Sequence, residues 1–76
     1  MLAISLTDSE DNDVAFHGSY AILSDSEVFN EAERVAKLYK ENDLGAVAVS
    51  VWYYEAPEKG YEFSDIDKVR IRCLSL

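Results

Sequence analysis

Apolar and polar positions along the chain alternate in four places and follow a helical spacing in one. Residues 2–7 alternate large apolar with small side chains, and residues 14–23 alternate again after the acidic stretch 8–13. A period of two is typical of half-buried strands, so we expect these two segments to pair as a hairpin. Residues 46–54 predict a third strand and residues 68–74 a fourth.

The segment between the second and third strands has the signals of a helix. Ser24-Asp25-Ser26-Glu27 matches a capping box, which places the N-cap at Ser24. We expect the helix to end near Asn42, ahead of Gly45. The stripe predicted to face the core comprises Val28, Ala32, Val35, Ala36 and Tyr39.

The element order predicts the fold class. A β-β-α-β-β chain of 76 residues is expected to form one α+β domain over residues 1–76, with one helix packed on one face of a four-stranded sheet. A helical crossover normally leaves the strands before and after it parallel. The acids after the second and third strands should therefore share one pole, with the turn 8–13 at the opposite pole.

The sheet face away from the helix is expected to be open to solvent. Trp, Tyr and Arg are enriched at binding hot spots, so this face is one candidate for a partner surface. Alternatively, its two arginines stack on Trp52 and Tyr54 and cover the sheet, or the face pairs with itself in a homodimer. Strict alternation assigns to it Ala3, Ser5, His17, Ser19, Ala48, Ser50, Trp52, Tyr54, Arg70 and Arg72.

Net charge is the composition value that changes the picture most. The chain carries a formal charge of −8, and no Lys or Arg precedes Arg34. Such a field repels nucleic acid and anionic membranes and attracts basic surfaces, so we expect a protein partner with a basic surface. The chain's start lacks the charged and apolar regions of a signal peptide, and its single cysteine suits a reducing compartment, so we expect a cytoplasmic protein.

The residues that carry chemistry are few. Alternation places His17 on the outward face of its strand and Cys73 on the opposite, buried face, so the two are not expected to act as a nucleophile pair. The turn 8–13 lacks the Gly and Glu of a calcium-binding EF-hand loop, and all fifteen acids fall at turns, loops or the helix surface. We therefore predict no catalytic residue, metal ligand or cofactor, and no enzyme activity.

The element order, the small size and the acidic surplus together resemble the small phage-encoded anti-CRISPR and other anti-defence proteins. The resemblance covers the whole chain and is carried by the capping box, its helix and the valine-rich strand at residues 46–54. It implies an inhibitor of a nucleic-acid-handling complex, with carboxylates in the places of phosphates. The order is also similar to β-grasp, ubiquitin-like folds, but the chain ends Cys73-Leu74-Ser75-Leu76 without the di-glycine of a modifier.

These observations favour a non-enzymatic binding protein that docks on a basic nucleic-acid-binding protein. The alternative is a structural or regulatory homodimeric module whose acidity serves only solubility. The residues predicted to bind the partner are Asp8, Glu10, Asp11, Asp13, Asp25, Glu27, Glu31, Trp52, Tyr54, Glu55 and Glu58.

Overall fold

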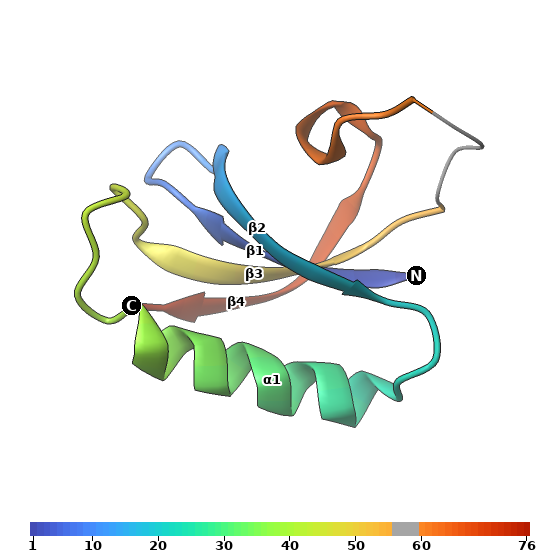
Figure 1. The fold of residues 1–76 in the computed structure, drawn as a ribbon, viewed down its shortest axis with the longest axis horizontal. Coiled ribbons are helices and arrows are strands. Elements are labelled where there is room, and N and C mark those ends of the chain that lie inside the picture. The colour runs from blue at the N-terminus through green and yellow to red at the C-terminus, as the bar shows by residue number, and fades with distance from the viewer. Residues whose placement is uncertain (56–59) are drawn as a thin grey trace.

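Four strands and one long helix make up the fold in the computed structural model, which describes residues 1–55 and 60–76 (Figure 1). One helix packs on one face of a single four-stranded sheet, which confirms the predicted α+β class. Within the described residues, no helix has the length and apolar character needed to cross a membrane. In chain order the elements are β1 (Leu2–Thr7), β2 (Asp13–Tyr20), α1 (Asp25–Leu38), β3 (Ala48–Tyr53), the 3-10 helix η1 (Phe63–Asp65) and β4 (Val69–Ser75).

The sheet has the order β2-β1-β3-β4, and every pair of neighbours is antiparallel. Because β2 and β3 both run antiparallel to β1, they are parallel to each other, as the crossover predicted. Leu2 faces Tyr20 on one side and Tyr53 on the other, so β2 and β3 end at the same pole. We call it the helix-start pole, because α1 also begins there, on the right of Figure 1. The turn 8–12 lies at the other end of β1.

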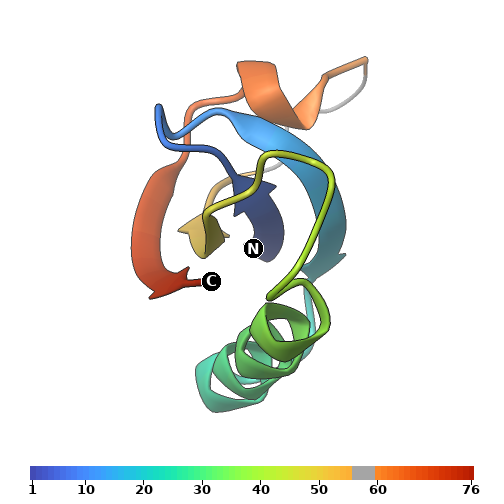
Figure 2. The ribbon, with the colours of Figure 1, turned by 90° about the vertical axis from the view of Figure 1, so that its left-hand side faces the viewer.

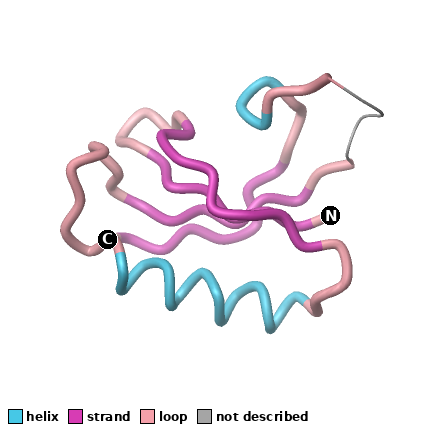
Figure 3. The backbone as a smooth tube through the Cα atoms, viewed as in Figure 1, coloured by secondary structure: helices cyan, strands magenta, loops and turns pink. Residues whose placement is uncertain are grey.

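The core lies between α1 and the sheet, and Figure 3 shows the helix running along that face. The predicted capping box is present: the Ser24 hydroxyl accepts from the Glu27 N–H, and the Glu27 carboxylate accepts from the Ser24 N–H. The helix ends at Leu38, four residues earlier than expected, and the Asn42 side chain donates to two backbone carbonyls and accepts from two backbone amides in the following loop. The fully buried core side chains include Ile4, Val28, Ala32, Val35, Val49 and Val51.

Two bulges in β2 break the alternation that the sequence predicted. Ile4 faces Gly18, but the next residue, Ser5, faces Phe16, so His17 is an extra residue in the strand. As a result Phe16 turns to the face away from α1. His17 instead contacts Glu31 of the helix, so the expectation that it lies on the outward face of the sheet is wrong.

A bulge in β4 likewise exchanges the faces of the residues in the second half of that strand. Trp52 faces Arg70 and Val51 faces Arg72, so Ile71 is the extra residue. Arg72 therefore lies on the helix side, 4.8 Å from the ring of Phe29. Cys73 is exposed instead of buried, and both predictions for these residues were wrong because a single inserted residue exchanges the two faces.

The sheet face away from α1 is covered. Figure 2 shows the sheet curling so that β2 and β4 rise on either side of the central strands, with η1 above them. Ala3, Ser5 and Ser50 have no exposed surface, Trp52 is 9% exposed and Tyr54 is 2% exposed. The prediction of an open face was wrong, because the segment before β4 folds back over it.

Candidate binding surface

Residues 63–68, which we call the cover, are held over Trp52 by a chain of polar contacts. The indole N–H of Trp52 donates to the Ser5 hydroxyl at 2.8 Å, and that hydroxyl donates to the Asp13 carboxylate at 2.6 Å. Asp13 forms an ion pair with Lys68 at 3.0 Å, with both side chains about nine-tenths buried (10% and 9% exposed). The Lys68 ammonium also donates to the Phe63 carbonyl at 3.2 Å. Asp13 begins β2 and its side chain is buried, so the expectation that every acid falls at a turn, a loop or the helix surface was wrong for this residue.

Aromatic packing completes the cover. The ring of Phe63 lies 4.9 Å from that of Phe16 and 5.7 Å from that of Tyr54, and the Tyr54 hydroxyl is hydrogen-bonded to Ser19. The Lys68 ammonium lies 4.9 Å from the Trp52 ring. Trp52 and Tyr54 belong to the interior, so the prediction that they are exposed aromatic anchors was wrong. Because both rings are buried, they are not exposed to a second copy of the chain either.

The acids of the turn 8–13 differ in how far they are available to a partner. Asp8 accepts the backbone N–H groups of Asn12 and Glu10, and the bond from Asn12 is the main reason that the pKa of Asp8 is lowered. Asp11 pairs with Arg70 at 2.7 Å, and its backbone has a positive φ of 63°. Asp13 is buried as described above. Glu10 alone is exposed and forms no ion pair with a described residue.

The acids of the helix also differ in how far they are available to a partner. Asp25 is exposed in the first turn, and Glu27 is exposed but takes part in the capping box. Glu31 lies one turn further on and forms a cluster with Arg34 at 2.7 Å and His17 at 2.9 Å. Hydrogen bonds from Arg34 and then from His17 lower the pKa of Glu31 to about 2.

The His17 cluster is the one place where a histidine and an acid meet. The carboxylate of Glu31 is hydrogen-bonded to Nε2 of His17. Among the described residues, no hydroxyl or thiol is hydrogen-bonded to the ring. Sequence alternation missed this pair, because the bulge at His17 turns the ring toward the helix. The described residues contain no group of three or more His, Cys, Asp or Glu side chains that could hold a metal ion.

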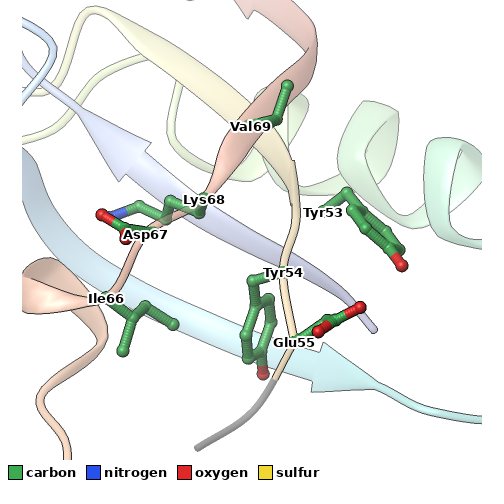
Figure 4. Close-up of a pocket in the computed structure, with 7 residues that line it drawn as sticks. All are labelled: Tyr53, Tyr54, Glu55, Ile66, Asp67, Lys68 and Val69. Atoms are coloured by element: carbon green, nitrogen blue, oxygen red, sulfur yellow. The ribbon is translucent and has the colours of Figure 1, made fainter.

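The residues that follow β3 lie at the helix-start pole. Glu55 is exposed and lines a hollow with Tyr53, Asp67 and Val69, and Figure 4 shows the Tyr53 and Tyr54 rings pointing apart. Tyr53 is 48% exposed and is the aromatic side chain that this end of β3 presents to solvent. Glu58 lies outside the described residues.

Most surface acids remain without an ion-pair partner among the described residues. Three of the six described bases, Lys68, Arg70 and Arg34, are each held by an acid of the same chain. The other three, Lys37, Lys40 and Arg72, form no ion pair with a described residue. The exposed acids without such a partner are Glu10, Asp25, Glu27, Glu33, Glu41, Asp43, Glu55, Glu62, Asp65 and Asp67.

Comparison of the chain with protein-family models, with curated proteins and with solved structures finds no match.

Proposed function

We propose that this protein is a non-enzymatic binding protein that docks on a basic surface of a nucleic-acid-binding protein and blocks it. The observation that carries the proposal is the surplus of exposed acids that no described base neutralises. Among the described residues, three of the six bases already form ion pairs with acids, and only Lys37, Lys40 and Arg72 do not. Lys68 and Arg70 are held by acids of the turn, and Arg34 is held by Glu31, so they offer little positive charge to offset the surface carboxylates.

The charges that meet the partner are the exposed, unpaired acids. Of the turn acids, only Glu10 meets that description, whereas Asp25 and Glu55 do so at the helix-start pole. A basic surface that normally holds phosphates accepts carboxylates by the same electrostatic complementarity. Electrostatics of this kind mainly accelerates and orients association, so an apolar contact is needed for tight binding.

Affinity capture tests the proposal. The tagged protein is incubated with a lysate of its native or host cell at low and at high salt, and bound proteins are identified and then challenged with DNA and RNA. We expect a basic nucleic-acid-binding protein that is retained at low salt and displaced by nucleic acid. Partners indifferent to both salt and nucleic acid, or recovery of the protein alone, would contradict the proposal.

A further inference from the structure

Apolar side chains lie exposed together at the helix-start pole. Leu23, Tyr53 and Ile71 are 38%, 48% and 43% exposed and line one groove of about 410 Å³. Val69 is 64% exposed and faces Tyr53 in the sheet, so the apolar strip continues along β4. Large apolar side chains gathered in this way on a small protein mark an interaction surface more often than scattered ones do.

The fold explains why this groove is uncovered. Helix α1 begins at Asp25, and its first buried side chain is Val28. At the next residue, Phe29, the guanidinium of Arg72 lies over the ring. The bulge in β4 leaves Ile71 on the helix side of the sheet but exposed. The groove therefore lies between the end of β3, the start of β4 and the segment that leads into α1.

The rim of the groove is acidic. Asp25 lines the groove itself, and Glu55 and Asp67 line the adjoining hollow that shares Tyr53 with it. Among the described residues, none of these three carboxylates forms an ion pair. Two nearby bases are occupied elsewhere, Lys68 by Asp13 and Arg72 over Phe29.

We propose that this groove binds a basic segment of a partner protein, with one aliphatic or aromatic side chain inserted beside Tyr53 and with Lys or Arg side chains against the acidic rim. The inference rests on the proposed docking on a basic surface and supplies the apolar contact that charge alone lacks. A second copy of this chain fits the groove poorly, because it would bring the same acidic rim against itself.

Two synthetic peptides of equal length and charge probe the groove. Both consist of Lys and Gly, one with a central Leu-Trp pair and the other with Ser-Ser in its place. Each is titrated into the ¹⁵N-labelled protein and followed by amide chemical shifts. We expect the Leu-Trp peptide to bind about tenfold more tightly than the Ser-Ser peptide, as burial of one large apolar side chain implies. Its shifts should centre on Leu23, Tyr53 and Ile71.

Matched variants locate the contact. Ile71→Thr and Leu23→Ser remove apolar surface from the groove. Leu23 lies outside the helices and strands of the described residues, so its replacement breaks no helix or strand hydrogen bond. The controls Val47→Thr and Leu44→Ser make comparable changes at residues 48% and 46% exposed, near the start of β3. Each groove variant should lose about tenfold in affinity for the Leu-Trp peptide, and the controls should lose none.

The outcomes of these experiments distinguish binding in the groove from docking by charge alone. Equal affinity of the two peptides, or shifts centred on the turn 8–12, would overturn the groove while leaving docking by charge intact. Failure of both peptides to bind at low salt would overturn the groove and count against docking on a basic surface as well. Concentration-dependent shifts at Tyr53 without peptide would overturn the inference in favour of a second copy of the chain.

Discussion

The ion pair between Asp13 and Lys68 is predicted to contribute much more to stability than the one between Asp11 and Arg70. In the first pair the side chains are 10% and 9% exposed, and in the second they are 63% and 31% exposed. Removing one partner of a buried pair costs about 3–5 kcal/mol because it leaves an uncompensated charge, whereas an exposed pair contributes about 0–1 kcal/mol.

The test replaces each acid by its amide. Asp13→Asn keeps an acceptor for the Ser5 hydroxyl but removes the charge opposite Lys68, so we expect a loss near the lower limit, about 3 kcal/mol. Asp11→Asn should lose less than about 1 kcal/mol. Urea unfolding followed by fluorescence of Trp52, the only tryptophan, reports both, and at about 1 kcal/mol per M the first loss lowers the midpoint by about 3 M.

A double-mutant cycle shows whether the ion pair itself is responsible. Asp13→Asn combined with Lys68→Met should lose less than the sum of the two single changes, by about 2 kcal/mol or more. The equivalent cycle at Asp11 and Arg70 should give a coupling of less than about 1 kcal/mol. Similar losses for Asp13→Asn and Asp11→Asn would refute the reasoning, because burial would then not distinguish the two pairs.

Three further predictions follow from the cover and the bulges. Phe63→Ala should increase acrylamide quenching of Trp52 fluorescence in the folded protein, and unchanged quenching, or an equal increase for the exposed control Tyr61→Ala, would count against the cover. The lowered pKa of Glu31 stabilises the fold above the ordinary value of 4.5, and this contribution is lost as pH falls through about 2. Glu31→Gln should therefore show a smaller fall in melting temperature over that range than the parent protein, and parallel curves would contradict this. Cys73 should react with a thiol reagent in the native state, and protection until unfolding would contradict its placement.

Local sequence signals predicted the elements of this fold well. The capping box at Ser24 fixes the helix start, because hydroxyl and carboxylate satisfy backbone amides within four residues of each other. The stripe of Val28, Ala32 and Val35 is buried as its spacing predicted. Parallel placement of β2 and β3 followed from the crossover alone, and with it the two acidic poles.

The sheet faces could not be predicted, because a bulge has no strong signal of its own in a single sequence. One extra residue at His17 exchanges the faces of its neighbours up to the second bulge of β2, and one at Ile71 exchanges the faces of the residues after it in β4. The cover over Trp52 is also a tertiary effect, since it depends on Lys68 reaching Asp13 from a distant part of the chain. Phe63, an aromatic residue between acids, was the only local signal of it.

The groove was missed for the same reason. Simple alternation, which placed Cys73 on the buried face, places Ile71 there as well and Trp52 at the surface, whereas Ile71 is 43% exposed and Trp52 is 9% exposed. Leu23, directly before the capping box, was assigned to the second strand, which ends at Tyr20. The exposed apolar residues of the groove, Leu23, Tyr53 and Ile71, are therefore ones that the regular pattern had placed inside strands.

Docking by the exposed acids is tested most directly by an association rate. The rate is measured between the captured partner and two triple variants of this protein. One variant is Glu10→Gln, Asp25→Asn and Glu55→Gln, and the matched control is Glu33→Gln, Glu41→Gln and Asp43→Asn, with the same change in net charge. We expect the first to associate about tenfold or more slowly than the parent at low salt and to lose most of its salt dependence, and the control to change little. Equal rates for the two variants would contradict docking through Glu10, Asp25 and Glu55 and leave net charge as the only electrostatic contribution.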